Sequence, residues 1–396
     1  MAVTRIGIDA TCWWNRRGFG RFTRGLLQAL FQLPGEQQFV LFIDHPPPPE
    51  MQRDNIRIVQ LMQRQPVTQA AVASGNRSPL DLWQCTRRVA AESLDVMFFP
   101  AVYSWFPVSL TLPTVVTLHD AIAERFPKLI FPGLRARLLW TLKVKLALWQ
   151  AKRVMTVSLA AKSDIITVLG VAPNRIDVIS EAASTHFRPI EEAHLRAHAR
   201  THCGLPEDGR YLIYVGGLAP HKNLSGLLRG FSLVLETGKY SDIFLILVGD
   251  PKGDGFHTNH SELENTVRAD PRLRRQVYFT GFVPDEQLSA LYSDGLAAVL
   301  PSFCEGFGLP AIEAMACGTP VLASNTGALP EVIGDAGLYF DPHDPEQIAA
   351  TIRRVLDNPE TLELLRQRAL LRAQQFTWEK SAQATLQYLL QCARNG

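Results

Sequence analysis

The chain has 396 residues, of which 46% are hydrophobic and 20% charged, with a net charge of +2, as in a folded globular protein of two or three domains. This composition excludes extensive disorder. No run of about 18 apolar residues occurs, which argues against a transmembrane helix. The N-terminus has no basic segment followed by an apolar one, which argues against a secretion signal. The six cysteines are scattered without a Cys-x-x-Cys pair, so we expect reduced thiols in a cytoplasmic protein.

The charge is unevenly distributed along the chain. Residues 1–190 hold 22 Lys and Arg against 13 Asp and Glu, whereas residues 191–396 hold 18 against 25. A basic N-terminal half suits an anionic membrane surface or a phosphorylated acceptor. An evenly spread, solvated surface is the alternative interpretation, because charge asymmetry concerns association and not fold.

Short apolar runs alternate with helix-length segments along the chain. The runs do not alternate apolar with polar residues, as expected of parallel strands buried on both faces. The expected strands of the first half are Thr4–Ala10, Phe39–Asp44, Ile56–Gln60, Asp95–Pro100, Thr114–His119, Arg153–Ser158 and Ile176–Ser180. Those of the second half are Tyr211–Gly216, Phe244–Gly249, Val277–Gly281, Leu296–Pro301, Pro320–Ala323 and Leu338–Phe340.

Because this βα pattern occurs twice, we expect an α/β protein of two Rossmann-like, doubly wound domains facing each other across a cleft. The N-terminal domain is expected over residues 1–185, a polar linker over 186–207 and the C-terminal domain over 208–378. A last helix follows at 379–396. In such sheets, ligands bind beyond the carboxyl ends of the strands.

The first two candidate positions lie in the N-terminal half. Gly18 and Gly20 would allow a tight turn into a helix over Arg21–Leu33, and arginines nearby would suit an anionic ligand. The spacing does not match a dinucleotide fingerprint, so a simple strand–helix connection is the alternative. His119, in Thr117–Asp120, ends a strand and could contact substrate, although a single histidine can also be purely structural.

The segment Leu134–Arg153 is predicted to be helical and rich in Leu, Trp, Lys and Arg. One apolar stripe is expected to face the core and a second runs beside it, while the basic residues do not gather on one face. A core helix with one membrane-touching side and a plain core helix are both compatible with this pattern. The expected core stripe is Leu138, Leu142, Leu146 and Trp149, and the second is Trp140, Val144 and Leu148.

His194, His198 and His202 follow one another at helical spacing. Successive helical turns are about 5.4 Å apart, so at most two of these imidazoles could share one zinc ion. The sequence also has no DxD motif that would hold a magnesium diphosphate. We therefore expect neither a metal site nor a cofactor.

Lys222 lies at the mouth of an expected strand–loop–helix unit in the C-terminal half. The strand runs into Gly216 and Gly217, and Asn223 is a good N-cap residue for a helix that begins at Leu224. A lysine in this place could reach a phosphate held over a helix N-terminus. An exposed lysine without a function is the alternative.

The most informative segment is Pro301–Pro320. Glu305 precedes a glycine turn, Gly306 to Gly308, and Pro310 favours the opening of a helix whose first N–H groups could bind an anion or hydroxyl oxygens. Glu313 falls within the apolar helix, where a buried carboxylate needs partners. Ligand hydroxyls are the expected partners, and local backbone donors are the alternative.

The segment Glu305–Ile333 resembles the family-4 retaining glycosyltransferases of the GT-B fold, with Glu305 and Glu313 as their E-x7-E pair. The resemblance extends over nearly the whole chain, through VISEAASTHFRP, FTGFVPDEQLSALY and FTWEKSA. GGLAPHKNL and GFGRF are similar to bacterial mannosyltransferases of surface polysaccharide assembly, including lipopolysaccharide. In this family the last helix crosses back onto the N-terminal domain.

The resemblance implies a metal-independent, retaining hexosyltransferase that uses a GDP- or UDP-linked sugar, with mannose from GDP-mannose as the expected donor and a glycan as acceptor. The basic N-terminal half also suits a lipid-diphosphate-linked acceptor. No nucleic acid partner is implied. From the scattered cysteines we expect a cytoplasmic protein, and from the basic N-terminal half peripheral contact with the inner face of the membrane. A sugar phosphorylase, a sugar-nucleotide epimerase or a non-catalytic nucleotide-sugar-binding subunit are the alternatives.

The family also implies roles for the candidate residues. Lys222 would hold the diphosphate, Glu305 the donor sugar and Glu313 the ribose. His119 would contact the sugar near the reacting carbon, and residues Gly281–Val283 would flank the base. The remaining donor-binding positions are Gly18, Gly20, Gly217, Gly306, Phe307, Gly308 and Leu309. Many family members carry an arginine shortly before the lysine, but this chain has Gly217 and Leu218 there. Either His221, an N-terminal arginine such as Arg21 or a helix N-terminus takes its place, or the leaving group is held less tightly.

Overall fold

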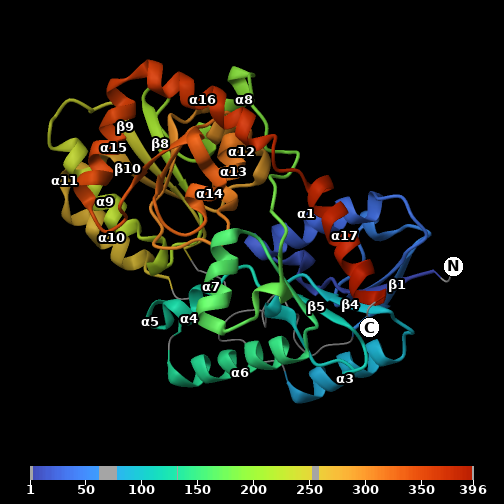
Figure 1. The fold of residues 1–396 in the computed structure, drawn as a ribbon. Coiled ribbons are helices and arrows are strands. Elements are labelled where there is room, and N and C mark those ends of the chain that lie inside the picture. Colours follow the sequence, from blue (N-terminus) through green and yellow to red (C-terminus); the bar gives the residue numbers. More distant parts are fainter. Residues whose placement is uncertain (1–2, 62–77, 132, 252–257, 395–396) are drawn as a thin grey trace. The chain divides into compact units, whose positions relative to one another are not determined.

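The computed structural model describes residues 3–61, 78–131, 133–251 and 258–394. The chain divides into two compact units. Unit 1 comprises the described residues of 1–181 and 377–396, and unit 2 comprises those of 182–376. Figure 1 shows the ribbon of both units.

Unit 1 is built on a seven-stranded parallel sheet in the order β3-β2-β1-β4-β5-β6-β7. Its strands are β1 Arg5–Asp9, β2 Gln38–Ile43, β3 Ile56–Gln60, β4 Val96–Phe99, β5 Thr114–Thr117, β6 Arg153–Thr156 and β7 Ile176–Val178. Its helices are α1 Gly18–Gln32, α3 Pro79–Ala90, α4 Ile122–Arg125, α5 Pro127–Ile130, α6 Leu134–Gln150, α7 Leu159–Leu169 and α17 Trp378–Arg394.

Unit 2 is built on a six-stranded parallel sheet in the order β10-β9-β8-β11-β12-β13. Its strands are β8 Arg210–Val215, β9 Ile243–Val248, β10 Val277–Gly281, β11 Ala297–Leu300, β12 Val321–Ser324 and β13 Gly337–Phe340. Its helices are α8 Ala193–His202, α9 Leu224–Leu235, α10 His260–Ala269, α11 Pro271–Gln276, α12 Asp285–Asp294, α13 Leu309–Ala316, α14 Leu329–Ile333, α15 Pro345–Asp357 and α16 Pro359–Ala373.

The central strands explain why the apolar runs of the sequence become parallel sheets. All side chains from Phe39 to Ile43 in β2, and all four of β4, are fully buried. A strand covered on both faces has no solvent side, so its residues need not alternate with polar ones. Each sheet reverses its strand order once, between β1 and β4 and between β8 and β11. The predicted pair of doubly wound domains is thereby confirmed.

The C-terminal helix α17 is part of unit 1, although it follows unit 2 in the chain. The Ser381 hydroxyl donates to the Ser180 carbonyl over 2.6 Å, and the Tyr388 hydroxyl donates to the Val154 carbonyl over 3.1 Å. A Cβ atom at Gly25 of α1 would lie 2.3 Å from the Trp378 ring. The glycine therefore lets the two helices approach closely.

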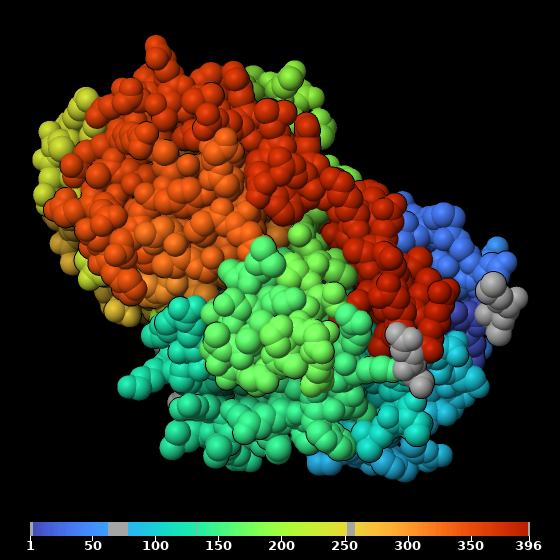
Figure 2. Space-filling view, viewed as in Figure 1, coloured from blue at the N-terminus to red at the C-terminus, as the bar shows by residue number. Residues whose placement is uncertain are grey.

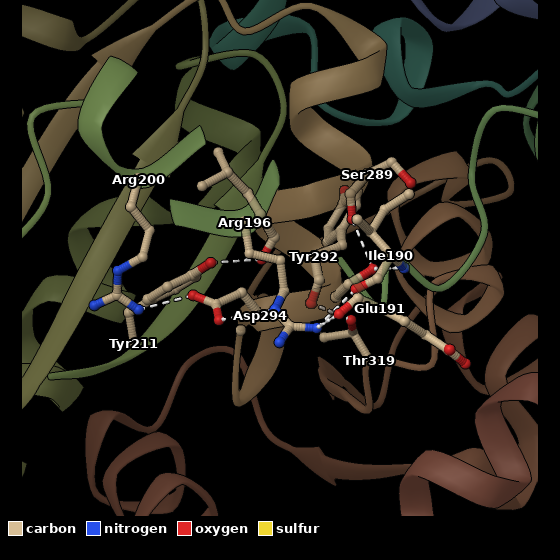
Figure 3. Close-up of polar contacts among 12 residues, drawn as sticks. Ile190, Glu191, Arg196, Arg200, Tyr211, Ser289, Tyr292, Asp294 and Thr319 are labelled. Carbon is tan, nitrogen blue, oxygen red and sulfur yellow. Dashed lines mark hydrogen bonds and ion pairs between the residues drawn. The ribbon is translucent and has the colours of Figure 1, made fainter. Parts of the chain in front are cut away.

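The segment expected as a polar linker over 186–207 is part of unit 2 and contains helix α8 (Figure 3). Arg200 of α8 binds Asp294 of α12 over 2.7 Å, and its guanidinium lies 5.3 Å from the centre of the Tyr211 ring. Before the helix, the Ile190 amide donates to Ser293 over 3.0 Å. A polar segment thus docks through ion pairs and backbone contacts, which hydropathy does not indicate.

The expectation for helix α6 is wrong for one stripe. All four residues expected in the core are exposed: Leu138, Leu142, Leu146 and Trp149. The neighbouring stripe, with Trp140 and Val144, is buried. Both stripes are apolar, so periodicity alone could not decide which one faces the sheet.

Among the described residues, no helix combines the length and apolar character that crossing a bilayer requires.

Candidate functional site

The strongest polar cluster of unit 2 lies where its sheet reverses, at the carboxyl ends of β8 and β11. Lys222, from the 3₁₀ helix Pro220–Lys222 after β8, places its Nζ 2.8 Å from both carboxylate oxygens of Glu305, which follows β11. The Ser302 hydroxyl donates to Glu305 Oε1 over 2.6 Å. The Phe303 amide also donates to the His221 carbonyl over 3.0 Å, so backbone and side chains tie the two loops together.

The Glu305 carboxylate is held in its ionised form. Burial favours the neutral acid, but the Lys222 ammonium and the hydrogen bonds from Lys222 and Ser302 outweigh it and lower the pKa of Glu305. At neutral pH this side chain accepts hydrogen bonds and has no proton to donate. It therefore suits hydroxyl donors or a cation, and not general acid catalysis.

His221 lies beside this pair and is kept uncharged. Burial, and then the adjacent Lys222 charge, lower the pKa of His221 to about 4, although Glu305 acts in the opposite direction. The buried Nδ1 atom has no hydrogen-bond partner among the described residues. The ring can offer one donor or acceptor to a bound group, but at neutral pH it does not supply the positive charge of an arginine.

A glycine turn connects Glu305 to helix α13, which begins at Leu309, one residue before the predicted Pro310. Gly308 is the N-cap residue with φ 96°, a left-handed conformation that favours glycine. The Phe307 side chain is buried, with its ring 5.7 Å from that of Phe376. Phe307 can therefore present only its backbone to a ligand.

Glu313 is buried within α13, with 3% of its surface exposed. Cys317 follows one turn later, and burial raises the pKa of this thiol to about 12, with the Glu313 charge adding to the rise. The two carboxylates of the E-x7-E pair thus differ. Glu305 joins the lysine in the loop, whereas Glu313 belongs to the buried helix.

Asn223 differs from its expected role. It precedes α9 as predicted, but it has φ 55° and its side chain makes no capping hydrogen bond. Its amide nitrogen instead donates to the carbonyls of Pro301, over 3.0 Å, and Pro342, over 2.7 Å. Asn223 therefore braces the loops after β11 and β13, a long-range role that local capping rules do not reveal.

Two further positions predicted in unit 2, Gly217 and Val283, follow β8 and β10. A Cβ atom at Gly217 would meet no heavy atom within 4 Å, so there is open space beside the loop after β8. Val283, expected near the base, is buried, whereas the preceding Phe282 is exposed. If this segment flanks a base, Phe282 offers the more accessible side chain.

In unit 1 the corresponding reversal lies between β1 and β4. Helix α1 begins at Gly18, not at the predicted Arg21, so both glycines lie in its first turn. A Cβ atom at Gly20 would come within 2.0 Å of the Asn15 carbonyl oxygen, which explains the glycine. The Phe19 and Tyr103 rings stack with centres 4.8 Å apart and join the segments that follow β1 and β4.

His119 lies after β5, and each of its ring nitrogens has an oxygen atom within hydrogen-bond distance. Its Nε2 is 3.0 Å from the Pro100 carbonyl oxygen, and its Nδ1 is 3.2 Å from Glu181 Oε1. The Phe22 ring meets the imidazole edge-on at 4.6 Å. Sequence reasoning missed Glu181, although its place directly after the last strand of unit 1 could have drawn attention to it.

The histidines at 194, 198 and 202 lie on α8, as their spacing indicated. Within the described residues, no group of three or more His, Cys, Asp or Glu side chains is arranged to hold a metal ion.

Comparison with protein families gives two adjacent matches. Residues 17–186 match the family described as Glycosyltransferase Family 4, and residues 197–372 match Glycosyl transferases group 1. The chain therefore belongs to the family-4 glycosyltransferases, with the GT-B fold that the sequence predicted.

Three curated relatives are similar over part of their length. O-antigen chain mannosyltransferase B of Escherichia coli is 35% identical over 60% of this chain and 60% of its own length. The serotype-specific mannosyltransferase WbdA of E. coli is 28% identical over 94% of this chain and 46% of its own. D-inositol 3-phosphate glycosyltransferase of Acidothermus cellulolyticus is 33% identical over 60% of this chain and 52% of its own length. The chain thus matches about half to three fifths of each relative.

Solved structures share the fold at low sequence identity. Sucrose-phosphate synthase of Thermosynechococcus elongatus superposes with a TM-score of 0.73 at 22% identity, covering 99% of this chain and 100% of that one. HepE of Anabaena in complex with UDP-glucose gives 0.73 at 18% identity, covering 98% and 100%.

Proposed function

We propose that this protein transfers a hexose from a nucleotide diphosphate sugar to a hydroxyl group of a glycan or lipid-linked acceptor, with retention of anomeric configuration. Mannose from GDP-mannose is the proposed donor. Two of the relatives described above carry the name mannosyltransferase, which supports this choice. The third is a D-inositol 3-phosphate glycosyltransferase, so the donor must be tested directly.

The observation that carries the proposal is the Lys222–Glu305 pair at the strand reversal of unit 2. This edge of a doubly wound sheet is where nucleotides bind. A lysine there can bind the diphosphate, while the ionised Glu305 keeps the ammonium in place and accepts hydrogen bonds from sugar hydroxyls.

The other candidate residues complete this donor site. Backbone N–H groups from Phe307 to Leu309 receive the sugar and phosphate oxygens at the start of α13, and Glu313 binds the ribose. The open space beside Gly217 admits the diphosphate to the loop after β8. For Gly18, Gly20 and His119 of unit 1, the roles implied by the resemblance, at the phosphates and at the sugar, stay predictions.

The arginine common in the family has no counterpart before Lys222, and His221 replaces only part of its role. The neutral ring can donate one hydrogen bond to a phosphate oxygen, but it adds no charge at neutral pH. The first turn of α13 provides further stabilisation in this proposal.

In the proposed reaction, the bond between the anomeric carbon and the diphosphate oxygen breaks early. The electron pair leaves with the diphosphate, whose growing negative charge is stabilised by Lys222 and backbone N–H groups. The acceptor oxygen then bonds to the anomeric carbon from the leaving-group face, and its proton passes to the departing phosphate. No step requires a metal ion, so we expect EDTA to leave the rate unchanged.

The experiment is a donor screen that measures both glycosyl transfer and release of the nucleoside diphosphate. GDP-mannose, UDP-glucose and UDP-N-acetylglucosamine are tested with an alcohol acceptor and, separately, with free phosphate. A phosphorylase would require phosphate, an epimerase would convert the donor without an acceptor, and a non-catalytic subunit would bind a donor without turnover. Any of these three results contradicts the proposal.

Lys222→Ala gives the matched test of the site. We expect kcat/KM to fall by about 10²- to 10³-fold, the usual cost of losing one group that stabilises developing charge. Lys239→Ala is the control, because this lysine of unit 2 is exposed and pairs with Asp357 outside the site. Equal activity of both variants would remove Lys222 from the proposed mechanism.

A further inference from the structure

The solvent-facing side of α6 is the most apolar exposed helix face that the structure describes. Leu134, Leu138, Leu142, Leu146 and Trp149 are all exposed, and Leu138 and Trp149 retain 69% and 70% of their surface. At 100° per residue these five side chains fall within about 120° of one another, so they form one face along the helix. Exposed apolar patches of this kind mark interaction sites.

Basic side chains lie within and beside this face, and acidic ones are missing from the helix. At 100° per residue, Arg135 and Lys145 fall inside the arc of the five apolar side chains, and Arg137 falls about 60° outside it. Arg135, Arg137 and Lys145 are exposed, and α6 contains no Asp or Glu over its 17 residues. Lys and Arg side chains can lay their apolar stems along a surface of Leu and Trp and extend their charged ends to lipid headgroups.

Further exposed apolar residues continue the surface beyond α6. Gln150, next to Trp149, donates to the Val108 carbonyl over 2.6 Å, and Thr86 of α3 donates to the Pro107 carbonyl over 2.6 Å. The segment at 107–108 therefore links the end of α6 to α3. Leu110 and Trp83 on these two segments are exposed, and the Arg87 guanidinium lies 4.8 Å from the Trp83 ring centre. Figures 1 and 2 show α6 and α3 along one side of unit 1.

We propose that α6 docks unit 1 onto the surface of an anionic phospholipid bilayer, with its Leu and Trp side chains in the acyl boundary and its Lys and Arg side chains at the headgroups. Charge decides between this occupant and a second copy of the chain. A symmetric dimer through α6 would bring Arg135 and Lys145 against the same residues of the other copy, which is unfavourable. An anionic bilayer complements both the apolar face and the charge.

The inner side of the same helix faces the strand-end region of unit 1. Trp140 donates to Glu124 over 2.6 Å, and its ring centre lies 5.0 Å from that of Tyr103, which follows β4 at the sheet reversal. Docking through α6 would therefore bring this region near the headgroups. That this would bring a lipid-linked acceptor close to the strand ends rests on the proposed function, whereas the docking itself does not.

The test is co-sedimentation of the full chain with vesicles of two compositions. One is phosphatidylcholine alone, and the other contains about 30% phosphatidylglycerol, enough anionic lipid to attract a basic, apolar helix. We expect binding to the anionic vesicles, weakened by salt, and at least about tenfold less to phosphatidylcholine. Leu142→Gln with Trp149→Gln should weaken binding at least about tenfold through lost apolar contact. Arg135→Gln with Lys145→Gln should weaken it about fivefold per residue.

Leu371→Gln and Arg354→Gln are the matched controls, because both residues are exposed on helices of unit 2. All variants should keep the melting temperature and the donor turnover with a soluble acceptor. Failure of the wild type to bind anionic vesicles at low salt, or equal binding by the α6 and control variants, overturns the proposal. A dimer in solution that the α6 variants convert to a monomer also overturns it, since the face would then join two copies. None of these results depends on which sugar is transferred.

Discussion

The two units place different chemistry at the same topological position. In unit 2, the loops after β8 and β11 meet through an ion pair, Lys222 to Glu305, with a neutral His221 beside it. In unit 1, the segments after β1 and β4 meet through stacked rings, Phe19 on Tyr103. The strand order therefore sets where a site can form, and the loop residues set what it can bind.

The ion pair gives the largest expected effect. Glu305→Ala should lower kcat at least about 10³-fold, because the sugar loses its acceptor and Lys222 loses the group that positions it. Glu305→Gln keeps the volume and should be nearly as inactive, since an amide does not restrain the lysine by charge. Steady-state kinetics and circular dichroism measure activity and folding separately. Glu360→Gln, an exposed residue of α16, is the control. Unchanged turnover would move the donor site away from the ion pair.

His221 makes the stability of unit 2 depend on pH in a defined direction. Its pKa is about 4 in the folded protein against an ordinary value of about 6.5, because burial and then Lys222 disfavour the imidazolium. The unfolded chain thus binds the proton more readily. The stability conferred by the neutral ring is fully present above pH 6.5 and is lost as pH falls toward 4, by about 3 kcal/mol in total.

Urea denaturation between pH 7 and 5 measures this effect above the range where carboxylates titrate. His221→Gln should flatten the pH dependence over that interval, whereas the exposed His198→Gln should not. If the unfolding free energy of His221→Gln depended on pH as strongly as that of the wild type, another group would be responsible for the pH dependence.

Two glycine-to-alanine variants test how closely each loop is packed. Gly20→Ala should destabilise by about 2 kcal/mol, because its Cβ atom would overlap the Asn15 carbonyl and the start of α1 would have to shift. Gly217→Ala should change stability by less than about 0.5 kcal/mol, since open space surrounds the new methyl group. The second variant should still weaken donor binding if the diphosphate occupies that space. Chemical denaturation and donor titration separate the two effects, and equal destabilisation would contradict the packing described.

Glu181 gives the smallest expected effect, as a positioning residue in unit 1. Glu181→Gln should lower kcat about tenfold and leave KM nearly unchanged, because the amide no longer holds His119 by charge while the fold is retained. Glu50→Gln is the matched control, being an exposed carboxylate of the same unit. If the melting temperature fell far enough to account for the lower activity, the role of Glu181 would be purely structural.

The sequence was most informative where function requires an unusual local composition. A site was predicted from the glycines after Glu305, the proline in the first turn of α13 and the lysine after β8. The structure brings Lys222 and Glu305 together. The sequence was less informative about partners that lie far apart in the chain. Asn223 braces two distant loops, and Glu181 lies 62 positions from His119. Neither pairing has a signal within one segment of sequence.

By itself, the amino-acid sequence determined the two parallel sheets, because uninterrupted apolar runs fit only strands covered on both faces. It also determined the family, through the segment Glu305–Ile333. The tertiary structure alone decided which apolar stripe of α6 is buried and that the polar segment at 186–207 docks onto unit 2. These outcomes depend on how complete elements pack, since two apolar stripes of one helix compete for the same sheet and only the contacts of the whole unit select between them.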